Sequence, residues 1–159
     1  MGVSNNLPAL PAQNGGNHRG TRQQRDSRRI YLISFITIKR ARLFDELLLA
    51  RMVVRHLKKQ EHTTTLAYVV MPDHVHWLLQ ITGDSSLESV VRSAKTNSAR
   101  SINTFYGRNG RVWQEGFHNH HVRRGDDLKY IARYLVANPI RAGLAKSVRE
   151  YAHWDAIWL

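Results

Sequence analysis

The sequence contains no cysteine among its 159 residues. Without cysteine there is no disulfide framework, no thiolate metal site and no cysteine nucleophile. The same absence is compatible with a reducing compartment. Any metal site or covalent chemistry must therefore rest on histidine, carboxylate, amide or hydroxyl side chains.

Long hydrophobic runs are also missing. No apolar stretch approaches the ~20 residues that a membrane-spanning helix needs. The first residues lack the apolar segment of a secretory signal. We therefore expect neither a membrane span nor secretion.

Acidic residues are scarce relative to basic ones. The chain has 12 Asp and Glu against 24 Lys and Arg, which gives a formal net charge of +12. Such an excess favours an anionic partner, with nucleic acid the first candidate and an anionic membrane surface the second. The length and the 42% hydrophobic content are typical of one globular domain.

Residues 1–28 have few apolar anchors and are rich in Asn, Gln, Gly, Pro and Arg. We expect them to form a disordered basic arm, followed by a single domain over residues 29–159. The arginines of this arm could contact phosphates without fixed structure. An unselected flexible terminus explains the composition equally well.

The rest of the chain alternates between strand and helix patterns. Strands are predicted at residues 30–38, on both sides of Pro72 within residues 66–80, and at 111–123; helices are predicted at 44–60, 87–106 and 128–138. The order β-α-β-β-α-β predicts an α+β, ferredoxin-like antiparallel sheet of four strands with helices on one face. An additional C-terminal helix, at residues 128–138, ends before Pro139.

Two histidines follow the Pro72-Asp73 turn. His74 and His76 are two residues apart in a predicted strand, so their side chains project from the same face. Two neighbouring neutral imidazoles suit a divalent cation. Paired histidines also occur on ordinary solvated strands, so the spacing alone leaves both interpretations open.

The last predicted helix carries a tyrosine away from its apolar stripe. Tyr134 lies off that stripe, and Asn138, four residues later, lies on the same face. Tyr130 is nearly opposite the stripe. Tyr134 is therefore a candidate reactive phenol, although the pattern also fits a half-buried tyrosine at the helix edge.

Further candidates are basic or aromatic. The helix at residues 87–106 is expected to be capped by Ser86, with Phe105 in its apolar stripe. Its polar face, with Arg92, Lys95 and Ser98, could lie along a phosphate backbone, or be simply solvated. Three histidines lie close together in the sequence, at His118, His120 and His121. They resemble a second metal cluster, but a second metal site is not favoured. Three aromatic side chains could either stack on bases or pack in the core: Trp77, Trp113 and Phe117. Core packing is favoured.

Three sequence blocks resemble the REP-associated tyrosine transposases, which belong to the single-tyrosine HUH endonuclease and transposase superfamily. The blocks are YVVMPDHVHW at 68–77, VWQxxF at 112–117 and ARYLVANPIRAGL at 132–144. They occur in the order and spacing of that family, and the resemblance extends from about Arg29 to Leu159. It implies a single ferredoxin-like domain that cuts single-stranded DNA at or near repetitive extragenic palindromes.

The resemblance also implies roles for particular residues. His74 and His76 would be catalytic metal ligands for Mg²⁺ or Mn²⁺, Tyr134 the nucleophile, and Asn138 a third metal ligand at a position where several relatives have Gln. His120 matches a position that the family often fills with histidine. Arg141 either contacts DNA or caps the end of the helix. The DNA-contact candidates are thus Arg92, Lys95, His120 and Arg141.

The expected function is metal-dependent nicking and rejoining of hairpin DNA through a 5′-phosphotyrosine intermediate. We expect such a protein in the bacterial cytoplasm, associated with the nucleoid, as a monomer or a homodimer. One alternative is a DNA-hairpin-binding protein that keeps the fold without catalysis. Another is a phosphoesterase with two H-x-T motifs, but His62-Thr63-Thr64 supplies only one.

Overall fold

The computed structural model describes residues 29–158. The predicted basic arm at residues 1–28 and the C-terminal Leu159 lie outside the described part. Within residues 29–158, no helix has the length and apolar character needed to cross a membrane.

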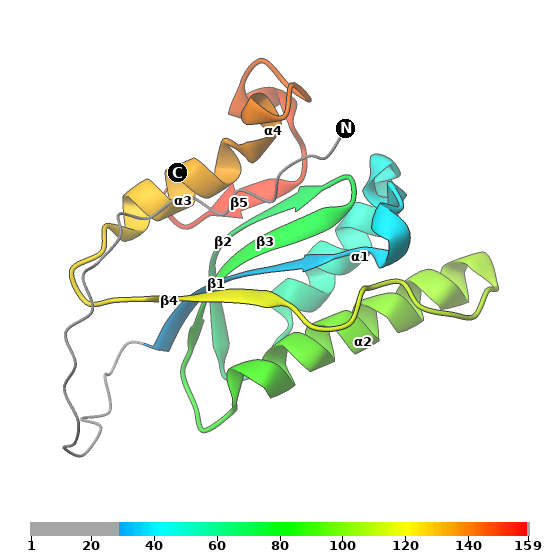
Figure 1. The fold of residues 1–159 in the computed structure, drawn as a ribbon, viewed down its shortest axis with the longest axis horizontal. Coiled ribbons are helices and arrows are strands. Elements are labelled where there is room, and N and C mark those ends of the chain that lie inside the picture. The colour runs from blue at the N-terminus through cyan, green and yellow to red at the C-terminus, as the bar shows by residue number, and fades with distance from the viewer. Residues whose placement is uncertain (1–28, 159) are drawn as a thin grey trace.

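The described chain folds into five strands and four α-helices, shown in Figure 1. In chain order these elements are β1 (Arg29–Ile36), α1 (Leu47–Lys58), β2 (Thr63–Met71), β3 (His74–Ile81), α2 (Leu87–Tyr106), β4 (His118–Val122), α3 (Leu128–Val136), α4 (Asn138–Arg141) and β5 (Trp154–Ala156). Short 3-10 turns occupy Ile38–Arg40, Leu43–Asp45 and Val148–Glu150. The observed order therefore confirms the predicted β-α-β-β-α-β arrangement and its additional helix.

The strands form one antiparallel sheet in the order β4-β1-β3-β2-β5. The first four strands have the predicted ferredoxin-like arrangement. The fifth strand was not predicted: β5 pairs with β2 through Ala67 and Ala156. The formation of β5 depends on its partner strand, because β2 offers an unpaired edge on which the aromatic C-terminal segment can pack.

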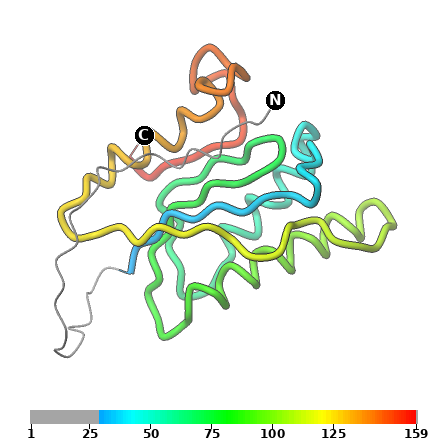
Figure 2. The backbone as a smooth tube through the Cα atoms, viewed as in Figure 1, coloured from blue at the N-terminus to red at the C-terminus, as the bar shows by residue number. Residues whose placement is uncertain are grey.

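Helices cover both faces of the sheet. One core combines α1 and α2 with sheet residues such as Phe35 and Trp77, and the other combines α3 with Leu32, Val69 and Leu78. Figures 1 and 2 show α3 across the sheet from α2. Alternate strand residues are apolar on both faces, so each face requires a cover. The prediction of helices on one face holds for α1 and α2, whereas the additional helix α3 occupies the other.

The predicted strand at residues 111–123 is shorter than expected. Only His118–Val122 pairs continuously with β1, and the preceding segment makes a single bridge between Thr37 and Trp113. The Lys95 ammonium group holds this segment through the carbonyl oxygens of Gln114 and Gly116, at 2.7 and 2.6 Å. These contacts tie the loop to α2.

Helix α2 has the predicted bounds, and the Ser86 hydroxyl accepts a hydrogen bond from the Ser89 N–H as the expected cap. Its polar face differs from the prediction at one position. Ser98 is buried, and its hydroxyl accepts a hydrogen bond of 3.0 Å from the Trp113 indole N–H. Conversely, the Phe105 ring, assigned to the apolar stripe, is 50% exposed.

Candidate active site

The predicted histidine pair lies on the α3 side of the central strand. Val75 and Trp77 point into the core below α1 and α2, so the alternating residues His74 and His76 point to the opposite face. The two imidazole centroids are 4.9 Å apart and the rings are nearly perpendicular, at 87°. The sequence-based expectation that the two rings lie side by side is therefore confirmed.

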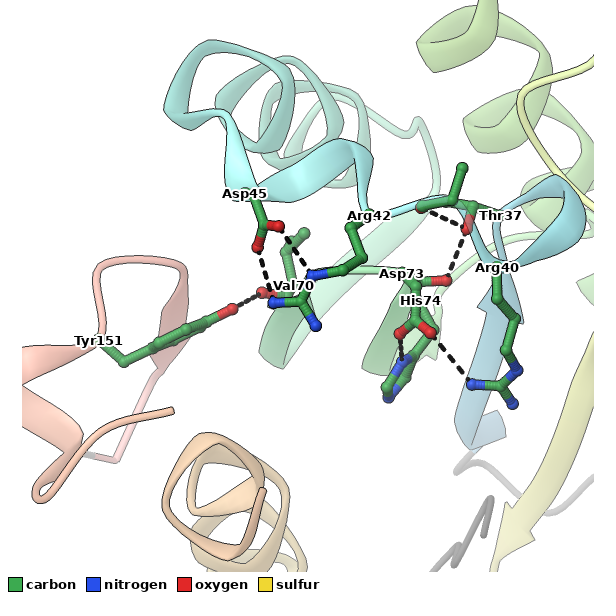
Figure 3. A network of polar contacts seen from close by, with 9 residues as sticks. Thr37, Arg40, Arg42, Asp45, Val70, Asp73, His74 and Tyr151 are labelled. Carbon is green, nitrogen blue, oxygen red and sulfur yellow. Dashed lines mark hydrogen bonds and ion pairs between the residues drawn. The ribbon is translucent and has the colours of Figure 1, made fainter. Parts of the chain in front are cut away.

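An aspartate orients the first of these rings. The Asp73 carboxylate lies 2.6 Å from His74 Nδ1 and 3.2 Å from Arg40 Nη1, as Figure 3 shows. The backbone of Asp73 is held in turn, because its carbonyl oxygen accepts hydrogen bonds from the N–H and the hydroxyl of buried Thr37, at 2.9 and 3.0 Å. An ionised carboxylate only accepts hydrogen bonds, so Nδ1 carries the proton. The His74 Nε2 lone pair is then available for a ligand.

The charge states suit this assignment. Burial raises the pKa of Asp73, but the hydrogen bonds and charges of His74 and Arg40 outweigh it and bring the pKa below its usual value. Burial lowers the pKa of His74 despite the neighbouring carboxylate. Burial, followed by the charges of His74 and Arg141, lowers the pKa of His76 to about 3. Both imidazoles are therefore neutral near pH 7, the state in which imidazole binds metals.

Tyr134 is held on α3 by an arginine from the next helix. The Arg141 guanidinium carbon lies 3.7 Å from the centroid of the Tyr134 ring. Its Nη2 donates a 2.6 Å hydrogen bond to the Tyr134 carbonyl oxygen, one of the last carbonyls of α3. The predicted capping role of Arg141 is thereby confirmed. The same guanidinium charge also contributes to the lowered pKa of His76.

Asn138 begins α4 after a break in the helix at Ala137. Helix α3 ends at Val136, two residues before the predicted end, and Pro139 occupies the first turn of α4, where its missing N–H costs nothing. The Asn138 amide nitrogen donates to the Leu135 carbonyl oxygen at 2.8 Å. The amide oxygen, the atom that could bind a cation, is left for other contacts, and metal ligation by Asn138 stays a prediction.

The donor set limits what the site could hold. Among residues 29–158, no group of three or more His, Cys, Asp or Glu side chains is arranged to bind a metal. A cation at His74 and His76 would need an amide, water or phosphate oxygen to complete its shell. Imidazole nitrogen is a better ligand for transition metals than for Mg²⁺. Of the two expected cations, Mn²⁺ therefore fits the two rings better than Mg²⁺.

Comparison with known proteins identifies the family. Residues 27–138, most of the chain, match the family described as "Transposase IS200 like". The chain belongs to the IS200-like transposases. The matched segment includes the histidine pair, Tyr134 and Asn138.

Two curated relatives agree with this assignment. The chain is 26% identical over 99 residues to a Haemophilus influenzae protein assigned as a REP-associated tyrosine transposase, covering 56% of each chain. It is 29% identical over 87 residues to the REP-associated tyrosine transposase of Escherichia coli, covering 54% of this chain and 49% of the relative. The aligned region thus spans about half the length of each relative.

Two solved structures share the fold. A REP-associated tyrosine transposase bound to a REP hairpin superposes with a TM-score of 0.65 at 19% identity, over 86% of this chain and 82% of that one. A Deinococcus radiodurans protein assigned as a transposase gives a TM-score of 0.53 at 18% identity, over 83% and 97%. These structures confirm the α+β fold inferred from the sequence, and the family model with the curated relatives confirms the family resemblance.

The three histidines at residues 118–121 do not converge on one point. His118 pairs with Ser34, which pairs with His76, so His118 and His120 share the face of the candidate site. His121 points to the opposite face, with its ring 5.2 Å from that of Tyr31. The three imidazoles therefore point to two different faces of the sheet, which agrees with the expectation that a second metal cluster is not favoured. A DNA contact by half-buried His120 stays a prediction.

The aromatic candidates are mostly structural. Trp77 is fully buried, and its indole N–H donates to the Thr65 hydroxyl at 3.0 Å. Trp113 packs edge-on against Phe35, with centroids 4.6 Å apart, and also contacts Phe44. The preference for core packing over base stacking is confirmed for both tryptophans.

The sequence-based interpretation missed the groups that orient the site. Asp73 directly precedes His74, so a carboxylate next to a potential ligand was a visible signal. Arg40 and Thr37 gave no such signal, because the fold brings them to Asp73 from more than 30 residues away. The Tyr151 hydroxyl, which donates to the Val70 carbonyl oxygen at 2.6 Å, likewise reaches β2 from the C-terminal segment (Figure 3).

The two basic candidates on α2 differ in their surroundings. Arg92 is exposed on the face of the sheet opposite the histidine pair, whereas Lys95 is committed to the loop carbonyls described above. We expect Lys95→Met to lower the free energy of unfolding by about 1–3 kcal/mol, because two charge-assisted hydrogen bonds are lost. Urea denaturation measures this change.

Arg92→Met is the matched control, since it also removes a cation from α2 and should change stability by less than about 0.5 kcal/mol. A Lys95→Met variant with unchanged stability but weakened DNA binding would support the predicted phosphate contact of Lys95 and contradict its loop-holding role.

Proposed function

We propose that this transposase nicks and rejoins single-stranded DNA at hairpin repeats through a covalent link to Tyr134. The observation that supports the proposal is a shared sheet face: α3, with the Tyr134 ring beneath the Arg141 guanidinium, covers the face toward which the orientated histidine pair points. Phosphodiester cleavage needs a positioned nucleophile and positive charge near the phosphate. This arrangement offers both.

The proposed reaction exchanges one phosphodiester bond for another. The Tyr134 hydroxyl oxygen attacks the scissile phosphorus and forms the tyrosine–phosphate bond as the bond from phosphorus to the 3′ oxygen breaks. The phenol loses its proton, and the departing 3′ oxygen gains one to become a free 3′-OH. Because the phosphate ester is conserved, a 3′-OH can reverse the step and rejoin strands without an external energy source.

Each residue of the site has a distinct task in this proposal. A bound Mg²⁺ or Mn²⁺ would supply Lewis acidity toward the phosphate, and the residues to hold it are His74, His76 and, through its amide oxygen, Asn138. Asp73 keeps the His74 Nε2 lone pair free by accepting a hydrogen bond from the Nδ1–H group. Arg141 restricts the Tyr134 ring to one orientation and keeps positive charge beside it.

The proposed DNA partner follows from charge and from the structural neighbour. The chain carries a formal charge of +12, and a protein of the same fold has been solved with a REP hairpin. The shared fold and the excess of basic side chains support hairpin DNA with single-stranded flanks as the substrate class.

The deciding test is a covalent-adduct assay. Wild-type protein is incubated with labelled hairpin oligonucleotides from the repeats of its own genome, with Mn²⁺, with Mg²⁺ or with chelator, and resolved on a denaturing gel. A metal-dependent protein–DNA band and a shortened product are expected. Tight binding without adduct or product in all three conditions would instead favour a non-catalytic hairpin-binding protein.

The orientating carboxylate provides a separate prediction. Asp73→Asn keeps the side-chain size but removes the charge that holds the His74 Nδ1 proton. We expect Mn²⁺ affinity to fall by about 10- to 100-fold, as for other substitutions behind a metal-binding histidine. Calorimetric titration with Mn²⁺ measures it.

Asp45→Asn is the matched control, because Asp45 is paired with exposed Arg42 in the same region and has no contact with His74 (Figure 3). Its Mn²⁺ affinity should stay within about twofold of wild type. Equal affinities of the two variants would rule out an orientating role for Asp73.

A further inference from the structure

The outward face of α3 combines one exposed aromatic ring with exposed cations. Its apolar residues pack on the sheet: Ile131, Ala132, Leu135 and Val136 are all buried. The outward side carries the exposed residues Lys129, Tyr130 and Arg133, and Tyr134 lies half-buried at its edge. The Asp127 carboxylate caps the helix by accepting from the Tyr130 N–H at 3.1 Å, which fixes the first turn.

Tyr130 has the most exposed ring on this face. It is 58% exposed, and no hydrogen-bond partner for its hydroxyl is found among residues 29–158. Its ring centroid is 6.5 Å from that of Tyr134, with an angle of 36° between the ring planes. An aromatic surface therefore lies one helical turn before the proposed nucleophile, and the fold leaves most of it uncovered.

Cations flank this ring. Lys129 and Arg133 are exposed and form no ion pair within the described chain, and Arg141 lies beyond Tyr134. On a helical wheel at ~100° per residue, Lys129 and Arg133 lie on one side of Tyr130, and Tyr134 lies on the other. Positive charge beside an exposed ring is the combination with which proteins bind single strands, since cations meet phosphates and rings stack on bases.

We propose that Tyr130 is a stacking platform for one unpaired base next to the phosphate that Tyr134 attacks. Lys129 and Arg133 hold the backbone of the same strand. The inference rests on the proposed function, because it places the scissile phosphate at Tyr134. It assigns Tyr130 a role in positioning the DNA and leaves the bond exchange to Tyr134.

An aromatic platform is favoured over a protein-docking patch by its surroundings. A protein interface tends to exclude charge from its centre, whereas Tyr130 is bordered by cations with no acidic partner. Single-stranded nucleic acid has the complementary chemistry: a negative backbone and bases with unpaired faces.

The test combines protein variants with abasic DNA. Equilibrium binding to labelled hairpins with single-stranded flanks is measured by fluorescence anisotropy, with each flanking nucleotide in turn replaced by an abasic site. We expect Tyr130→Ala to weaken binding about 5- to 150-fold, the range for loss of one stacked base. Tyr130→Phe and Tyr130→Trp should stay within about threefold of wild type, because each keeps a ring.

The decisive readout is the coupling between protein and DNA changes. At one flanking position, the abasic site should weaken wild-type binding but leave the binding of Tyr130→Ala unchanged, as in a double-mutant cycle. Phe105→Ala is the control, because it truncates a similarly exposed ring on α2, across the sheet. Additive losses at every position, or wild-type affinity of Tyr130→Ala, would overturn the platform.

Failure of the platform is distinguishable from failure of the proposed function. Coupling at one position without any covalent adduct supports the platform and contradicts the nuclease. Adduct formation without coupling contradicts the platform and leaves the nuclease intact. Absence of wild-type binding to every hairpin would overturn both.

Discussion

Replacing Tyr134 by Phe is expected to abolish the covalent protein–DNA adduct and to lower the cleavage rate by at least ~10³-fold. The phenylalanine ring can still pack beneath the Arg141 guanidinium, whose contact with the ring face does not involve the hydroxyl. Since the hydrogen bond from Arg141 is made to the backbone carbonyl, it also remains possible. The variant should therefore fold and bind DNA while lacking the attacking oxygen.

The measurement has two parts. A denaturing gel quantifies adduct and product under the metal condition in which the wild type is active, and anisotropy measures hairpin binding. Binding within about threefold of wild type, together with background levels of adduct, is the expected combination. Parallel loss of binding and cleavage would indicate a structural rather than a nucleophilic role.

Tyr106→Phe serves as the matched control. It removes an exposed phenol on α2, where the hydroxyl donates to Glu46, on the side of the sheet away from the histidine pair. Adduct formation by this variant should equal that of the wild type. An adduct that persists in Tyr134→Phe would identify a different nucleophile and overturn the proposed mechanism.

The second large effect is expected at the histidine pair. Replacing His76 by Gln removes one of the two imidazole donors and should reduce metal-dependent cleavage on the order of 10²–10⁴-fold, because metal ions contribute several kcal/mol to phosphate transition states. Addition of chelator to the wild type should have an effect at least as large. Single-turnover cleavage against Mn²⁺ concentration gives both the rate and the apparent metal affinity.

Burial of His76 requires a stability control. Its ring is only 8% exposed, so a substitution changes packing as well as ligation. Thermal unfolding without metal separates the two effects, and a folded variant that responds to Mn²⁺ only at much higher concentration supports ligation. His121→Gln, on the opposite face of the sheet, should cleave like the wild type. Cleavage by the wild type that persists in chelator would contradict the metal role.

Much of the fold could be predicted from local patterns. The alternating and β-branched segments identified the four main strands, and Ser86 and Gly107 bracket α2 as its capping chemistry requires. The i,i+2 spacing of His74 and His76 was enough to place both rings on one face, because that relation depends only on strand geometry. The additional helix was also predicted from its apolar period, with an end only two residues too late.

The features that local patterns did not reveal depend on distant contacts. Lys95 was assigned to a DNA-facing surface because its local surroundings are polar, and that contact stays a prediction; the fold also brings the carbonyl oxygens of Gln114 and Gly116 to its ammonium group. Ser98 was assigned to the same surface and is buried against Trp113. Strand β5 forms only because β2 has a free edge to receive it.

The sequence by itself determined the strand and helix order, the pairing of the two imidazoles and the excess of positive charge, since each depends on residue type and short-range spacing. Only the tertiary structure decided that α3 covers the face of the sheet that bears the histidines, that Asp73 is anchored by Thr37 and Arg40, and that Arg141 stacks on Tyr134. The physical reason is that burial and hydrogen bonding act between groups that are close in space, and for these groups proximity arises only when the sheet has assembled and both of its faces are covered.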